Sequence, residues 1–126
     1  MSQVTEYSFG NDPIVVRKYL DAIKGGRLLD VSDFTEDVIQ AGHVIIRDTA
    51  TRKVYKPMPV ADGAYDSLPE GYEYVGIQIA TVSKNEPYVA ILTIGEVNDK
   101  VLPFDMTSIL SAFKAAVPTI TFGHDD

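Results

Sequence analysis

Histidine is the side chain that most often serves as general base for a nucleophilic hydroxyl, and this chain has two, His43 and His124. His43 opens an apolar stretch, where a side chain bonded to the backbone is the usual occupant. His124 stands beside Asp125 and Asp126, near the end of the sequence. No G-x-S-x-G segment presents a serine to either histidine. The sequence therefore predicts no catalytic residue and no enzyme, and the enzymatic alternative is a small hydrolase or a metal-dependent enzyme centred on His43.

Four carboxylates within eight residues are the next candidates for chemistry: Asp30, Asp33, Glu36 and Asp37. Such a cluster suggests calcium, but the ligand pattern D-x-[DN]-x-[DN]-G is absent, so we interpret it as a solvated loop. Cysteine is absent, which excludes disulfides and thiolate metal sites. The zinc, dinucleotide and phosphate motifs H-E-x-x-H, G-x-G-x-x-G and G-x-x-x-x-G-K are absent as well. We expect no metal and no cofactor.

The charge balance is strongly acidic, with 11 basic and 18 acidic side chains and a formal charge of −7. This balance opposes binding modes that neutralise phosphates, so we expect no nucleic-acid partner. Arg47, Arg52, Lys53 and Lys56 form the densest basic group, which we interpret as the solvated rim of a hairpin. No stretch approaches the roughly 20 apolar residues of a membrane span, so we expect no membrane partner.

Residues 73–104 contain the strongest strand pattern. Val75, Ile77 and Ile79 alternate with other residues, which is typical of a half-buried strand. Residues 88–94 are apolar on both faces, so this second strand should be covered on both sides. The polar segment 83–86, followed by Pro87, predicts a tight hairpin between the two strands.

The remaining elements are shorter. We expect strands within 27–31, 38–39, 43–47, 52–56 and 119–122, and an extended sheet edge or interface at 56–60, where Pro57 and Pro59 cannot lie in mid-sheet. Residues 14–24 fit either an extended segment or a helix with an apolar face formed by Val16, Tyr19, Leu20 and Ile23. Asp105 could cap a helix from Met106 to Val117 that Pro118 ends.

Together these patterns predict a mainly β (α+β) fold, a compact β-barrel or sandwich-like domain with one C-terminal helix packed on the sheet. The length suits one domain. We expect an N-terminal arm at 1–12, a single β-rich domain at 13–123 and an acidic tail at 124–126. The arm is polar with isolated apolar residues, Val4, Tyr7 and Phe9, and would be ordered only by docking on something else.

Aromatic surface is the remaining functional signal. Tyr55, Tyr65, Tyr72 and Tyr74 are concentrated in one third of the chain and could anchor a protein interface, or could cap the end of a barrel with their hydroxyls in water. With the proline-rich edge they define a predicted trimer or partner interface made of Tyr55, Pro57, Met58, Pro59 and Tyr65. The alternative is a β-barrel module that binds carbohydrate or peptide through residues 55–74.

Five segments carry a resemblance to a known family: GGRLLDVSDF, AGHVIIRDTATRKVYKPMPV, LPEGYEYVGI, PYVAILTIGEVND and ILSAFKAAVPTITF. In order and spacing they resemble the head fiber proteins of tailed phages and prophages of gut Bacteroidetes. More distantly they are similar to lambda-type head decoration proteins, whose G-x-[VF]-N segment resembles Gly95-Glu96-Val97-Asn98 here. The resemblance covers residues 25–122.

The resemblance implies a virion structural protein, a β-rich homotrimer on the outer surface of a phage capsid. Such a protein bridges and stabilises major capsid subunits without catalysis, and a surface glycan is a further possible ligand. It would be made in the cytoplasm of the host bacterium. In that family the N-terminal arm often docks on the capsid, which here assigns capsid binding to Val4, Tyr7 and Phe9.

Overall fold

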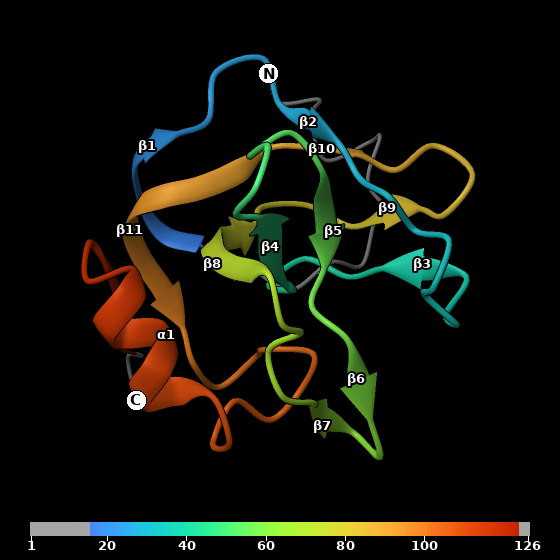
Figure 1. Ribbon diagram of the computed structural model, residues 1–126. Helices are drawn as coiled ribbons and strands as arrows, with labels where there is room; N and C mark the ends of the chain where they lie inside the picture. The colour runs from blue at the N-terminus through green and yellow to red at the C-terminus, as the bar shows by residue number, and fades with distance from the viewer. Residues whose placement is uncertain (1–15, 124–126) are drawn as a thin grey trace.

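The computed structural model describes residues 16–123, which form a mostly β structure with one helix, as the sequence predicted (Figure 1). Along the curled main sheet the strand order is β1 (Val16–Ala22), β11 (Ile91–Asn98), β8 (Tyr72–Gln78), β4 (Val44–Asp48) and β5 (Tyr55–Pro57), with β12 (Ile120–Gly123) parallel to β11. Three two-stranded sheets flank it: β2 (Arg27–Leu28) with β10 (Tyr88–Val89), β3 (Val38–Ile39) with β9 (Val82–Ser83), and β6 (Val60–Ala61) with β7 (Ala64–Tyr65). The helix, α1, spans Leu110–Ala116.

Among residues 16–123, no helix has the length and apolar character that crossing a membrane requires. The predicted arm and acidic tail, with Val4, Tyr7, Phe9 and His124, lie outside the described residues.

The main sheet is covered on both faces, as predicted for the strand that contains Ile91 and Leu92. Both side chains are fully buried, Ile91 in one apolar cluster and Leu92 in another. Ile45 and Ile46 on β4 are divided between the same two clusters. Neighbouring residues of one strand therefore fill opposite cores, which requires apolar side chains at both positions.

The turn predicted at 83–86 forms, but the connection between β8 and β11 is longer than the predicted tight hairpin. The strands pair antiparallel, Leu92 opposite Ile77, but residues 79–90 leave the main sheet between them. Within this excursion β9 pairs with β3, and β10 pairs with β2. The excursion places Val89 on β10, where it is buried in the second core.

The ambiguous segment before Gly25 is a strand. β1 pairs antiparallel with β11 and occupies one end of the sheet order. Three register irregularities interrupt the pairing of β1, and Gly25 and Gly26, both with positive φ, turn the chain into β2. A β-carbon at Gly26 would lie 2.7 Å from the Val89 carbonyl oxygen, so glycine is required there for conformation and for space. The alternative helix, with Tyr19 and Leu20 on a buried face, is wrong.

The opposite end of the sheet order is β5, which includes Pro57. This confirms the edge placement predicted from the missing N–H group of proline.

α1 is shorter than predicted, and its cap differs. Ile109 occupies the N-cap position without a side-chain hydrogen bond, and Asp105 instead bonds to Thr107 in the preceding turn. The predicted cap at Asp105 is therefore wrong. Phe113 is fully buried and fixes the helix against the sheet, with its ring edge-on to Tyr74.

Candidate functional site

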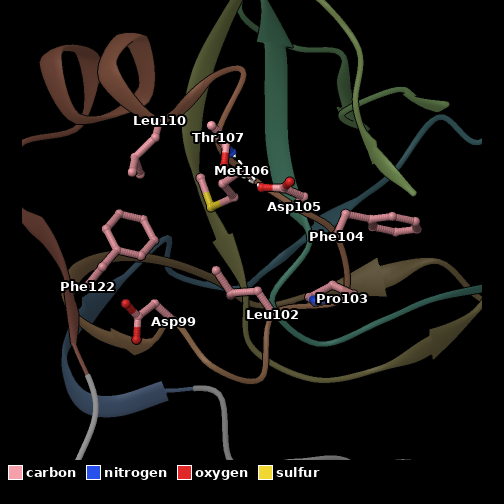
Figure 2. Close-up of a pocket in the computed structure, with 9 residues that line it drawn as sticks. All are labelled: Asp99, Leu102, Pro103, Phe104, Asp105, Met106, Thr107, Leu110 and Phe122. Atoms are coloured by element: carbon pink, nitrogen blue, oxygen red, sulfur yellow. Dashed lines mark hydrogen bonds between the residues drawn. The ribbon is translucent and has the colours of Figure 1, made fainter. Parts of the chain in front are cut away.

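A cavity of about 350 Å³ lies between α1, β12 and the loop from Asp99 to Thr107 (Figure 2). Most of its lining is apolar, from Leu102, Pro103, Phe104, Met106, Leu110 and Phe122. Asp99, Asp105 and Thr107 supply the polar part. Its volume is within the range of pockets that hold small molecules or a partner's side chains. We call this cavity the α1 pocket.

The polar groups give the α1 pocket negative charge. The Oδ1 atom of Asp105 accepts hydrogen bonds from the backbone N–H of Thr107 at 2.8 Å and from its Oγ1 at 2.7 Å. These bonds hold the pKa of the Asp105 carboxyl below its ordinary value, so the side chain is ionised at neutral pH. Figure 2 shows Asp99 on another side of the pocket, near Phe122 and Leu102. The pocket thus combines an apolar lining with carboxylates, a combination suited to an apolar group that carries a neighbouring cation.

A second surface feature is an exposed apolar edge. Among the described residues, four of the five exposed large hydrophobic side chains lie on β1, β2 and β10: Tyr19, Leu20, Leu28 and Tyr88, between 58% and 66% exposed. Leu28 and Tyr88 are cross-strand partners, and β1 continues through the glycine turn into β2 (Figure 1). Val54, the fifth, lies elsewhere and is 39% exposed. We call the four residues the apolar edge.

The apolar edge is also the basic part of an acidic chain. Residues 16–28 contain four basic residues and one acidic residue, Asp21, whereas the rest of the chain contains seven basic and seventeen acidic residues. Arg17 forms an ion pair with Glu96 at 2.9 Å, and Arg27 donates to the carbonyl oxygens of Gly26 and Lys24. The segment that carries the edge is therefore rich in basic residues, and the charge of one of them, Arg17, is balanced by Glu96.

His43 is not placed to act as a base on a substrate. Its ring is fully buried, and Phe34, Tyr65 and Phe104 contact it edge-on. Burial lowers the pKa of His43 to about 4, although its bond to the Met58 carbonyl oxygen acts in the opposite direction. The position fits the structural interpretation, a strand side chain with a backbone partner.

The residues of the predicted aromatic interface are mostly buried within the chain. Tyr55, Met58 and Tyr65 are at most 6% exposed, Pro57 is also buried, and Pro59 is half-buried. Tyr65 points inward because its hydroxyl accepts a hydrogen bond from the Val44 N–H at 3.0 Å, and burial raises its pKa. These side chains belong to the chain's own cores, so they offer little surface to a trimer partner. Among residues 16–123 the exposed tyrosines are Tyr19 and Tyr88, and neither was predicted as an interface residue.

Arg47, Arg52 and Lys56, three members of the predicted basic group, lie close to carboxylates. Arg47 Nε donates to Glu73 at 2.8 Å, and its Nη1 donates to the Tyr55 hydroxyl at 3.2 Å. Arg52 lies 3.8 Å from the same Glu73 carboxylate. Lys56 lies 3.5 Å from Asp33 and over the ring of Tyr72. Much of the positive charge of this group is therefore balanced within the chain.

Two carboxylates of the acidic run at 30–37 have partners within the chain. Asp30 accepts hydrogen bonds from the N–H and hydroxyl of Ser32, which lower its pKa, and Asp33 meets Lys56. Phe34, the aromatic residue within this run, is buried. In the described part of the chain, no three His, Asp or Glu side chains are grouped so that they could hold a metal ion.

The α1 pocket and the apolar edge were both missed by the sequence reasoning. For the edge the sequence carries no clear signal, because adjacent apolar residues such as Tyr19 and Leu20 can both be buried where a sheet is covered on both faces, as Ile91 and Leu92 are. For the pocket the sequence offers none, since its lining comes from a loop, a helix and a strand.

Comparison of the chain with protein-family models, with curated proteins and with solved structures finds no match in any of the three.

Proposed function

We propose that this chain is a non-enzymatic virion structural protein, a homotrimeric decoration module that binds the outer surface of a phage capsid and bridges its major capsid subunits. The observation that supports assembly most directly is the apolar edge, four large apolar side chains exposed on β1, β2 and β10, since exposed apolar surface is a mark of interaction sites. The capsid as partner is supported by the sequence resemblance over residues 25–122.

The arrangement of the ionisable groups favours a role in contact over a role in catalysis. His43 is enclosed by the rings of Phe34, Tyr65 and Phe104. The carbohydrate alternative relied on the aromatic residues 55–74, and Tyr55, Tyr65 and Tyr74 are core residues. No observation of the described residues therefore favours that alternative.

The acidic charge is compatible with a decorating role. A chain of net charge −7 is repelled by nucleic acid and remains dispersed until it meets its partner. Three joined copies would present each capsid contact three times, so a weak single contact could still give firm attachment.

The test is binding to purified phage heads that lack their decoration protein. Labelled protein should co-sediment with the heads, saturate at a fixed number of copies, and appear on the outer surface by electron microscopy. Bovine serum albumin carrying the same label controls for trapping in the pellet. Absence of saturable binding to heads of the matching phage would refute the proposal.

A further inference from the structure

We propose that the apolar edge of one copy docks into the α1 pocket of the next copy, so that the protein assembles head to tail. This inference rests on the proposed function only in its expectation of an oligomer. It names the two surfaces that meet.

Both surfaces are largely apolar. The pocket is a cavity of about 350 Å³ lined by apolar groups that include Leu102, Leu110 and Phe122. The edge presents Tyr19 and Leu20, more than half exposed, from a strand at the end of the sheet order. Burying such side chains in an apolar pocket stabilises a complex, and aromatic anchors in pockets are the usual centres of protein interfaces.

Charge distinguishes a second copy from a generic apolar partner. The edge segment carries four basic residues and one acidic residue, whereas the pocket it would enter has Asp99 and Asp105 in its lining. Asp105 is ionised at neutral pH. The same chain thus holds an apolar–basic projection and an apolar–acidic hollow, and opposite potentials at a contact fix its orientation and exclude wrong partners.

The form of β1 favours side-chain docking over strand addition. Three irregularities interrupt its register with β11, and Leu20 is the extra residue between the pairs Tyr19–Gly95 and Asp21–Ile94. Bulges of this kind disturb the backbone ladder that an added strand would extend. Two edges are therefore poorly suited to pair with each other.

The apolar edge and the α1 pocket share no residue. A contact between the edge of one copy and the pocket of another therefore joins two different surfaces. Such a heterologous interface closes into a ring when the rotation between copies permits. A threefold ring is the closure that matches the proposed homotrimer.

The experiment measures mass by light scattering coupled to size-exclusion chromatography. The edge variant Tyr19→Ser/Leu20→Ser and the pocket variant Thr107→Arg should both be monomeric where the unaltered protein is trimeric. Thr107 is exposed, and its backbone bond to Asp105 does not depend on the side chain, so this variant should fold. Val54→Ser, an exposed apolar residue outside the edge, is the matched control and should remain trimeric. Thermal melts monitored by circular dichroism confirm that each variant is folded.

Mixing the two monomeric variants gives the sharper result. The edge variant keeps an intact pocket and the pocket variant keeps an intact edge, so the mixture restores one contact. A 1:1 complex with twice the protomer mass is expected. An isologous edge-to-edge contact would restore nothing.

Asp105→Asn tests the charge separately, because the amide oxygen can still accept from Thr107. It should weaken self-association severalfold at low salt.

The outcomes separate this inference from the proposed function. Edge and pocket variants that remain trimeric overturn the head-to-tail contact and leave capsid decoration standing. Dissociation of the edge variant with a trimeric pocket variant also overturns it, since the edge would then meet another surface. A monomeric unaltered protein overturns the contact and also contradicts the homotrimer of the proposed function, whereas binding to heads tests the capsid as partner separately.

Discussion

His43 Nε2 lies 2.8 Å from the carbonyl oxygen of Met58 and donates its proton to it. The bond fixes the neutral ring with its proton on Nε2, since a carbonyl oxygen can only accept. The other nitrogen, Nδ1, is buried without a hydrogen-bond partner among the described residues. A second proton on Nδ1 would therefore create a buried charge among aromatic rings without a hydrogen-bond partner, which explains the low pKa of His43.

Stability should fall as the pH falls from about 6.5 to about 4. In the unfolded chain His43 takes up a proton near pH 6.5, whereas in the folded chain its pKa is about 4. Between these values the unfolded state binds more protons, so acidification favours unfolding, by about 3 kcal/mol in total. Urea denaturation at intervals across this window measures the effect.

The matched variant is His43→Phe. The quantity to compare is how steeply the free energy of unfolding changes with pH in each protein, because the substitution itself also changes the absolute stability. The free energy of unfolding of the variant should be nearly flat between pH 6.5 and 4. Further loss below pH 3.8 should persist in both proteins, because Asp30, Asp48 and Asp105 have lowered pKa values. An equal slope in both proteins would show that His43 is not the titrating group.

Gly76→Ala should destabilise the protein by about 3 kcal/mol or more. A β-carbon at this position would lie 2.0 Å from the Leu92 carbonyl oxygen, so strands β8 and β11 could not keep their spacing. Gly63→Ala is the control: Gly63 has positive φ but open space around it, and should cost only about 1 kcal/mol. Chemical denaturation compares the two, and equal costs would contradict the steric argument.

Phe113→Ala should cost roughly 3–5 kcal/mol through the cavity that it leaves. The ring is fully buried, with edge-on contacts to Tyr74 at 5.5 Å and Phe122 at 5.9 Å between centroids. Ser111→Ala, on an exposed position of the same helix, should change stability by less than about 0.5 kcal/mol. A thermal midpoint near that of the unaltered protein for Phe113→Ala would mean that α1 does not pack as described.

Deleting residues 1–9 should leave the oligomer intact but weaken adsorption to undecorated heads, because the arm with Val4, Tyr7 and Phe9 is the predicted capsid contact. Binding curves of both forms to the same heads measure the difference, and light scattering controls for assembly. If full-length and shortened protein adsorb equally, the role given to the arm is rejected.

Local pattern was sufficient for much of the fold. Alternation around Ile77 and the two-sided apolar run at Ile91–Leu92 predicted the central strands, and proline chemistry placed Pro57 at a sheet edge. These predictions succeed because both signals are local. The side chains of a strand alternate between its two faces at every residue, and proline lacks an N–H group wherever it stands. The predicted direct connection of the two strands failed because it depended on distant partners, the pairing of β9 with β3. The predicted cap failed for a local reason, because Asp105 bonds to Thr107 and the helix begins only after Ile109.

The sequence by itself determined a mainly β domain with one helix, an acidic surface charge and the absence of thiol chemistry, since composition and short-range periodicity suffice for each. Only the tertiary structure decided which aromatic residues face solvent. It buried Tyr55 and Tyr65 and exposed Tyr19 and Tyr88, and it gathered Leu102, Leu110 and Phe122 around one cavity. Exposure depends on which strands lie at the ends of the sheet and what covers them, and that choice is made by long-range packing.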